Sequence, residues 1–272
     1  MLVDTHAHLE AVDDLERLLL RAKEAGLGKI ITIGTSLESS KKAIVIAEKY
    51  SDSDLQLYTT CGIHPEDGKG DIGKFGSIEK CISKLRKIIK SSKKVIGVGE
   101  TGLDYHLGTS DQRPVTTYDD KKFQRELFET QIKLATDLEL PIVVHCRNAW
   151  DEIFEILTVN SQKLKAKDVF HSWTGNWQAA QKALDLGFYI SFSGIVTFAN
   201  AADIAEVAKK APIGRILIET DSPFLSPEPL RGRKNEPKNV KITADFIAKL
   251  RGLSPYKIMG VTTLNANEVF GI

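Results

Sequence analysis

The chain has 272 residues, 42% of them hydrophobic, so it can bury a large core, and α/β barrels often occupy this length as a single domain. A net charge of +1 gives no global sign of nucleic acid, a membrane or an acidic partner. Three cysteines without CxxC spacing, no basic-then-apolar leader and no long apolar run predict a soluble cytoplasmic protein without disulfides, membrane association or an obligate protein partner.

Short apolar stretches alternate with amphipathic helical patterns along the whole chain. In chain order, they predict strand 2–7, helix 13–25, strand 29–34, helix 37–50, strand 57–62, helix 78–90, strand 94–100, a loop at 106–117, helix 120–138, strand 142–146, helix 150–158, strand 169–171, helix 179–186, strand 188–192, helix 201–210, strand 215–221, and helices 240–250 and 255–270. Near-continuous Val, Ile and Leu runs suit a parallel sheet that is buried on both faces. Eight βα units predict one (β/α)8 TIM barrel domain over residues 1–272. A doubly wound open sheet is the alternative, weakened because no glycine fingerprint follows the first strand.

Histidines gather where the predicted strands end, which is where active sites form in this barrel. All six lie at or beside a strand end: His6, His8, His64, His106, His145 and His171. Glu100 and Asp221 end the fourth and eighth strands. A carboxylate buried at a barrel mouth is costly unless something compensates its charge, and a bound cation does so. The pattern predicts a metal site.

The ligand-type residues divide between two ions. His6 and His8 share a strand face because side chains repeat every two residues, and Asp221 ends the strand that lies beside them in a closed barrel. His145 and His171 come from neighbouring strands and provide a second site, and Glu100 has two oxygens with which to bridge both ions. Mixed nitrogen and oxygen ligands suit Zn²⁺, Mn²⁺ or Fe, with Mg²⁺ at the more carboxylate-rich position, and the sequence does not choose among them.

Seven segments carry a family resemblance. They are residues 4–9 (DTHAHL), 62–65 (GIHP), 99–104 (GETGLD), 141–147 (PIVVHCR), 171–175 (HSWTG), 219–223 (ETDSP) and 231–237 (RGRKNEP). Together they resemble the TatD family of metal-dependent deoxyribonucleases, within the amidohydrolase-like barrels. The resemblance implies two divalent ions (Mg, Mn or Zn) on His6, His8, Glu100, His145, His171 and Asp221. It further implies hydrolysis of phosphodiester bonds in DNA by a two-metal-activated water, often from the 3′ end of single strands. The family also includes activity on RNA, and some relatives are linked to removing D-amino acids from tRNA.

Five residues are each expected to act in catalysis or substrate binding, or to have a named alternative role. Asp221 accepts a proton from the attacking water, or serves as a ligand only. His64 donates to a phosphate oxygen, or makes a structural hydrogen bond, and Arg147 holds a phosphate, or makes a surface salt bridge. Trp173 stacks on a base, or packs at the barrel mouth. Asn235, in a basic loop that favours a polyanion, contacts the nucleotide or caps the loop.

Three more residues receive assignments. Glu219 shares a strand face with Asp221 but lies one layer deeper, so it is expected to support the site and not to act in catalysis directly. Asp104 is either structural or near the substrate, and His106 is expected to be a loop histidine near the rim.

The leading functional hypothesis is a two-metal nuclease on DNA. Ester hydrolysis on D-aminoacyl-tRNA is the second. A small-molecule amidohydrolase is the third, and Glu100 argues against it because that barrel usually bridges its metals with a modified lysine at the end of strand four. A metal-binding scaffold without activity is the fourth, and the six filled ligand positions argue against decay.

Overall fold

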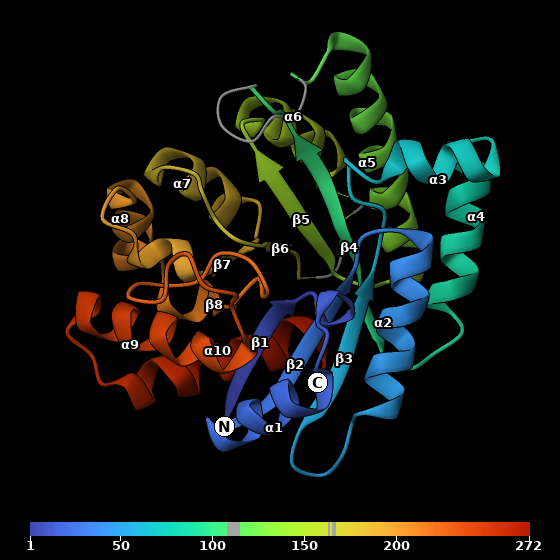
Figure 1. Ribbon diagram of the computed structural model, residues 1–272. Coiled ribbons are helices and arrows are strands. Elements are labelled where there is room, and N and C mark those ends of the chain that lie inside the picture. The colour runs from blue at the N-terminus through green and yellow to red at the C-terminus, as the bar shows by residue number, and fades with distance from the viewer. Residues whose placement is uncertain (108–114, 163, 165–166) are drawn as a thin grey trace.

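The computed structural model describes residues 1–107, 115–162, 164 and 167–272. Within these residues, eight parallel strands form one sheet whose order follows the sequence (Figure 1). The strands are β1 (Leu2–Ala7), β2 (Leu27–Gly34), β3 (Gln56–Cys61), β4 (Val95–Asp104), β5 (Ile142–Arg147), β6 (Val169–Phe170), β7 (Tyr189–Phe192) and β8 (Ile216–Ile218).

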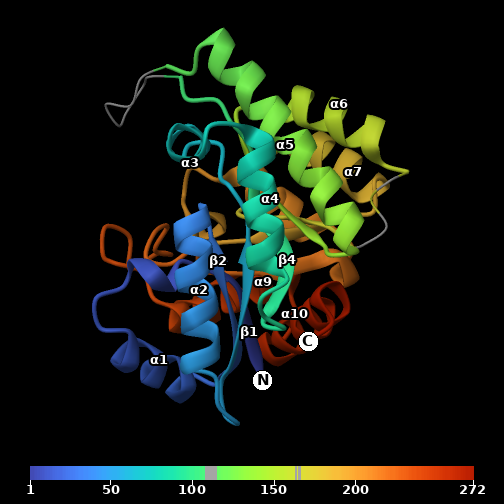
Figure 2. The same ribbon diagram turned by 90° about the vertical axis from the view of Figure 1, so that its right-hand side faces the viewer.

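Helices surround the sheet. They are α1 (Leu15–Glu24), α2 (Leu37–Lys49), α3 (Gly68–Phe75), α4 (Ile78–Ile89), α5 (Tyr118–Leu138), α6 (Trp150–Asn160), α7 (Trp177–Asp185), α8 (Ala202–Lys210), α9 (Val240–Arg251) and α10 (Pro255–Phe270). Figure 2 shows α2, α4 and α5 side by side on the outside of the strands, where α4 contacts both α2 and α5. Among the helices described, none combines the length and the apolar character needed to cross a bilayer.

Local sequence explains where several of these helices begin. The side chains of Ser36, Ser77 and Thr117 accept hydrogen bonds from backbone N–H groups in the first turns of α2, α4 and α5. These bonds satisfy donors that a helix start otherwise leaves without a partner. The predicted starts at 37 and 78 are confirmed, and α5 begins slightly earlier than predicted because Thr117 and Asp120 cap each other reciprocally.

The sheet closes where the chain after β8 returns to β1. Ala7 forms a parallel bridge with Ser222. The N–H of Asp221 donates to the carbonyl oxygen of His6 at 2.8 Å, and the N–H of His8 donates to the carbonyl oxygen of Ser222 at 2.7 Å. The predicted (β/α)8 TIM barrel is therefore confirmed, and this closure brings the first and last ligand segments together.

Apolar side chains fill two regions. Ile31 and Ile33 of β2 belong to an inner cluster with residues of most other strands, whereas Ile30 belongs to the larger cluster between sheet and helices. This alternation is what a small barrel requires. Val269 and Phe270 of α10 complete the inner cluster. A packed interior leaves the carboxyl ends of the strands as the place for a site.

The structure differs from the sequence prediction at three elements. Helix α3 was not predicted, because its three glycines disfavour a helix, although Asp71 within it is anchored by accepting a hydrogen bond from the N–H of Leu37. Strand β4 runs on to Asp104, and β8 ends at Ile218, before the ligand segment. Of the loop predicted at 106–117, residues 108–114 lie outside the described residues.

Candidate metal centre

Glu100 reaches the barrel mouth from an irregular point in β4. Between two positions where β4 and β5 pair, β4 carries an extra residue, and Gly99 lies at this point. A bulge of this kind re-aims the side chains next to it. Gly99 has a φ of +151°, and a Cβ there would lie 2.7 Å from the carbonyl oxygen of Val143. Only glycine fits, and its freedom turns the Glu100 carboxylate toward the pocket.

Asp4 ties β1 to the chain after β8. Its carboxylate accepts hydrogen bonds from the N–H of Thr220 at 2.9 Å and from the Thr220 hydroxyl at 2.5 Å. Complete burial raises the pKa of Asp4 to about 8. The next residue, Asp221, has a φ of +58°, a conformation that Asp tolerates better than most residues. These features bring Asp221 beside His6 and His8.

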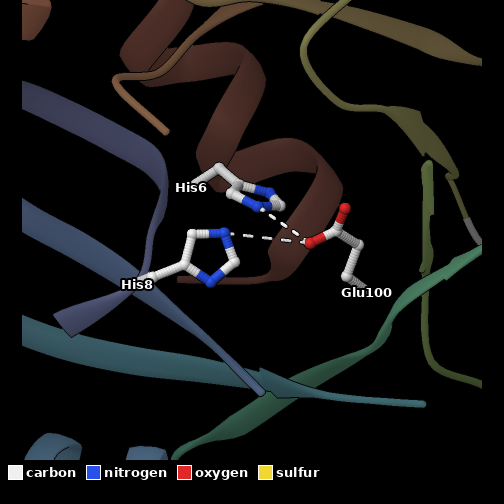
Figure 3. A group of neighbouring side chains, drawn as sticks. All are labelled: His6, His8 and Glu100. Atoms are coloured by element: carbon white, nitrogen blue, oxygen red, sulfur yellow. Dashed lines mark ion pairs between the residues drawn. The ribbon is translucent and has the colours of Figure 1, made fainter. Parts of the chain in front are cut away.

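One oxygen of Glu100 faces a first ligand group, made of His6, His8 and Asp221. Glu100 Oε2 lies 3.4 Å from His6 Nε2 and 3.9 Å from His8 Nε2 (Figure 3). Asp221 Oδ1 lies 3.5 Å from His6 Nε2 and 3.2 Å from His8 Nε2. Two imidazole nitrogens and two carboxylate oxygens therefore converge on one point.

The other oxygen of Glu100 faces a second ligand group, made of His145 and His171. Glu100 Oε1 lies 2.9 Å from His145 Nδ1 and 2.7 Å from His171 Nε2, and those nitrogens are 3.1 Å apart. The two groups adjoin, because the His6 and His171 rings stack with centroids 4.0 Å apart. The predicted division between two groups, with Glu100 between them, matches this geometry.

The charges of the two groups are coupled. Burial would raise the pKa of Glu100, but the neighbouring His171 and hydrogen bonds from His145 and His171 hold it well below its usual value. Burial would lower the pKa of His171, but the Glu100 carboxylate raises it well above the ordinary value. For Asp221, the hydrogen bond from His8 and the charges of the neighbouring histidines together outweigh burial and lower the pKa. Both carboxylates are therefore ionised, as metal ligands must be.

These residues fit a divalent cation. His6 Nε2, which faces the carboxylates of Glu100 and Asp221, is buried without a hydrogen-bond partner among the described residues. Buried polar atoms nearly always have a partner, so a nitrogen of this kind beside two ionised carboxylates fits a bound cation. Potential ligand atoms lie within 4.8 Å of one another in three triads: His6, His8 and Glu100; His6, His171 and Asp221; and His64, Glu100 and His145. The nitrogen and oxygen donor set suits Zn²⁺, Mn²⁺ or Fe²⁺.

The ligand groups form the floor of a pocket with a volume of about 790 Å³. Four residues that line it have a positive φ although they are not glycine: Asn148, Ser172, Asp221 and Leu225. Such conformations cost free energy and gather at functional sites. The pocket is therefore the candidate active site, at the carboxyl ends of the strands.

Comparison with known proteins decides the family. A family model described as TatD related DNase matches residues 3–271. The chain belongs to the TatD family. It is 36% identical to the uncharacterized metal-dependent hydrolase YabD of Bacillus subtilis over 275 residues, which is 100% of both chains. It is 32% identical to YcfH of Escherichia coli, described in the same words, over 100% of this chain and 96% of that one.

Solved structures agree with this assignment. The crystal structure of YJJV, a TatD homologue from Escherichia coli, has a TM-score of 0.85 and 28% identity, covering 100% of this chain and 98% of that one. A TatD-family hydrolase from Entamoeba histolytica, with a TM-score of 0.82, 24% identity and the same coverage, shares the fold. The chain is a metal-dependent hydrolase of the TatD family.

Two carboxylates of this TatD-family hydrolase support the second ligand group. Asp104, which also lines the pocket, lies with Oδ2 3.0 Å from His145 Nε2. Glu219 accepts hydrogen bonds from the N–H of Ser172 at 2.7 Å and from the Ser191 hydroxyl at 2.5 Å, and lies 3.4 Å from His171 Nδ1. Glu219 therefore lies behind the ligand group beside His171, as a supporting role predicts.

His64 and Arg147 both line the pocket, as a role in substrate binding requires. His64 Nε2 lies 3.5 Å from Glu100 Oε1, and its Nδ1 accepts a hydrogen bond from the N–H of Glu66 at 3.2 Å. Burial lowers the pKa of His64 to about 3. Its neutral ring therefore carries the proton on Nε2, facing the pocket as a donor. Arg147 Nη1 lies 3.9 Å from Asp104 Oδ2.

Trp173 and Asn235 are both buried, which favours their alternatives over contact with the substrate. Trp173 is 1% exposed, packs against Trp150 and Phe170, and donates its indole N–H to the carbonyl oxygen of Gly175. A ring buried on all sides has no face for a base. Asn235 is also 1% exposed, and its side-chain amide donates and accepts hydrogen bonds only within its own loop among the described residues.

The remaining histidine and the cysteines are buried. His106 lies in the loop that follows β4 and is 4% exposed, and among the described residues it does not line the pocket. Cys61, Cys81 and Cys146 are free and buried, as expected of small core residues. Burial raises the pKa of the Cys61 thiol to about 12, which makes it a poor nucleophile.

Sequence reasoning missed Phe224, an exposed aromatic residue at the pocket rim. Its ring centroid lies 5.8 Å from that of His8. The available signal was its place directly after the Asp221-Ser222-Pro223 segment, which carries a ligand.

Proposed function

We propose that this TatD-family hydrolase is a divalent-metal-dependent DNase that removes nucleotides from the 3′ end of single-stranded DNA, using two ions. The observation that carries the proposal is the Glu100 carboxylate, whose two oxygens face separate groups of ligand atoms. Bound divalent ions supply Lewis acidity toward a phosphate and activate water. The first site would use His6, His8, Asp221 and Glu100, and the second would use His145, His171 and Glu100.

Asp221 is suited to take a proton from the attacking water. Its pKa is lowered by the hydrogen bond from His8 despite burial, so the carboxylate is free to accept a proton at neutral pH. It also lines the pocket, where a substrate phosphate must lie. A group in this position acts as a general base when the water lies within hydrogen-bond reach.

His64 and Arg147 are suited to hold the phosphate. His64 offers an Nε2–H donor that is fixed by its hydrogen bond from Glu66. Arg147 brings a guanidinium that is about one-third exposed, and this group binds phosphate oxygens in pairs. Together they would orient the phosphodiester and neutralise part of its charge.

The decisive experiment uses 3′-labelled single-stranded DNA with Mg²⁺ or Mn²⁺ and a chelator control. Wild type is expected to release labelled mononucleotides only with metal, and Glu100→Ala is expected to release none. Glu126→Ala, which removes an exposed glutamate from α5, is the matched control and should behave as wild type. Strands labelled at the 5′ end should give a ladder of shortened products, and circular single strands should persist.

A folded, metal-loaded wild type that leaves DNA intact would disprove the proposal. RNA and D-aminoacyl-tRNA are the next substrates in that case, because the same residues would hold a phosphate beside either bond.

A further inference from the structure

Phe224 exposes an aromatic ring beside the first ligand group. Its side chain is 56% exposed, and its ring centroid lies 5.8 Å from that of His8. We propose that Phe224 is the surface on which a nucleobase stacks while the adjoining phosphate lies at the metal centre. This inference rests on the proposed DNase function and assigns the base-binding part of the same pocket.

The backbone around Phe224 is fixed although its ring is open. The N–H of Phe224 donates to the carbonyl oxygen of Asp221 at 2.9 Å. Asn235 donates from Nδ2 to the carbonyl oxygen of Phe224 at 2.8 Å, and its own N–H donates to the carbonyl oxygen of Pro223 at 3.0 Å. An apolar ring on a rigid backbone loses little conformational entropy when a ligand covers it. Asn235 thus serves the site through the loop it caps.

The composition of the pocket singles out this ring. Among the described residues that line the pocket, Phe224 is the only phenylalanine, tyrosine or tryptophan. Two further apolar side chains, Ile195 and Leu225, also line it. Single exposed hydrophobic residues are common on protein surfaces, but here one lies beside the ligand groups of a hydrolase. Stacking on an aromatic ring accepts any base, which suits an enzyme that removes nucleotides in succession.

The experiment combines substitution of Phe224 with removal of the base from the substrate. Wild type, Phe224→Ala and Phe224→Trp act on two oligonucleotides, one ordinary and one whose last two nucleotides lack a base. Stacking contributes enough for about a tenfold effect. Wild type is expected to lose about tenfold in kcat/KM when the bases are missing. Phe224→Ala should lose about tenfold on ordinary DNA and nothing further on the baseless substrate, and Phe224→Trp should keep the wild-type preference.

The outcomes separate this inference from the function on which it rests. If Phe224→Ala slows cleavage of both substrates equally, the ring only supports His8. If it slows cleavage of neither, the base binds elsewhere. Either result overturns the inference but leaves the DNase proposal intact. If wild type cleaves neither oligonucleotide, the DNase proposal fails, and this inference fails with it. Tyr256→Ala, which removes another exposed ring, on α10, is the control and should match wild type on both substrates.

Discussion

At the scale of single residues, His145 shows how a neighbour decides which nitrogen can bind a metal. Asp104 Oδ2 lies 3.0 Å from His145 Nε2. Burial would raise the pKa of Asp104, but this hydrogen bond and the charges of His145 and Arg147 together lower it. An ionised carboxylate accepts a hydrogen bond from Nε2–H and leaves the Nδ1 lone pair directed at the ligand group. Asp104 therefore tunes a ligand while it also lines the pocket.

Replacing Asp104 should weaken metal binding in two steps. Asp104→Asn keeps an acceptor oxygen but removes the charge, and Asp104→Ala removes both, so affinity should fall in the order wild type, Asn, Ala. The Ala variant is expected to lose about 10- to 100-fold, as is common when a partner of a ligating histidine is removed. Calorimetric titration of the metal-free protein with Mn²⁺ measures this. Asp119→Ala, an exposed change on α5, is the control, and equal affinity of the Ala variant and wild type would show that Asp104 has no such role.

The sequence predicted which ligand-type residues converge at the pocket, and that His64 and Arg147 line it, but it did not predict which aromatic residue is exposed there. Glu100, Asp221 and the histidines were predictable because a parallel barrel brings all its strand ends together, so residue type and position suffice. For Trp173, residue type alone was ambiguous, since the path of the following loop decides whether a large ring is buried. Phe224 carries no pattern at all, because one exposed aromatic residue in a loop resembles any other.

At the scale of elements, the bulge in β4 is the feature on which the site depends. Gly99→Ala would bring its Cβ to 2.7 Å from the Val143 carbonyl oxygen, in a conformation that alanine disfavours. We expect β4 to shift, with a loss of roughly 1–3 kcal/mol in the free energy of unfolding and of most metal affinity. Urea unfolding and Mn²⁺ titration measure the two effects.

The matched control for Gly99→Ala is Gly73→Ala in α3. A Cβ at Gly73 would meet nothing within 4 Å. Alanine favours a helix by about 1 kcal/mol over glycine, so this variant should be slightly more stable and bind metal normally. A Gly99→Ala variant with wild-type stability and affinity would show that the bulge does not set the Glu100 carboxylate.

The elements that the sequence misjudged were decided by contacts between segments distant in the chain. Strand β8 was predicted to extend to Asp221, but it ends at Ile218. The reason is that Thr220 makes hydrogen bonds with the side chain of Asp4 in β1 instead of continuing the strand. Helix α3 forms despite its glycines because tertiary contacts such as Asp71 with the Leu37 N–H outweigh propensity. Local pattern carries no information on such partners.

At the scale of the whole molecule, Asp168 couples barrel stability to pH. Its buried carboxylate accepts a hydrogen bond from the Ile142 N–H at 2.9 Å, and burial raises its pKa from 3.8 to about 7. The unfolded chain therefore releases this proton before the folded one does. The stability contributed by the protonated form is complete below about pH 4 and is lost as pH rises to about 7.

Asp168→Asn should remove this pH dependence while keeping an acceptor for Ile142. Relative to wild type, the variant should gain free energy of unfolding between about pH 4 and pH 7 and then stay level, with an upper bound of about 4 kcal/mol at 1.4 kcal/mol per pKa unit. Urea unfolding of metal-free protein at a series of pH values measures the difference. A difference that does not change with pH would contradict the assignment.

Metal binding should stabilise the entire barrel, because its ligands lie in or directly after β1, β4, β5, β6 and β8. An ion bound only by the folded state adds about 1.4 kcal/mol to the free energy of unfolding for each tenfold rise in free metal above its dissociation constant. Two ions should double that slope, and Glu100→Ala, which loses the shared ligand, should flatten it. Unfolding in urea over several decades of buffered Mn²⁺ measures the slope, with Glu126→Ala as control. A wild-type slope of about 1.4 kcal/mol per tenfold rise in free Mn²⁺, the value for one ion, would contradict the two-ion proposal. Occupation of both ligand groups requires twice that slope.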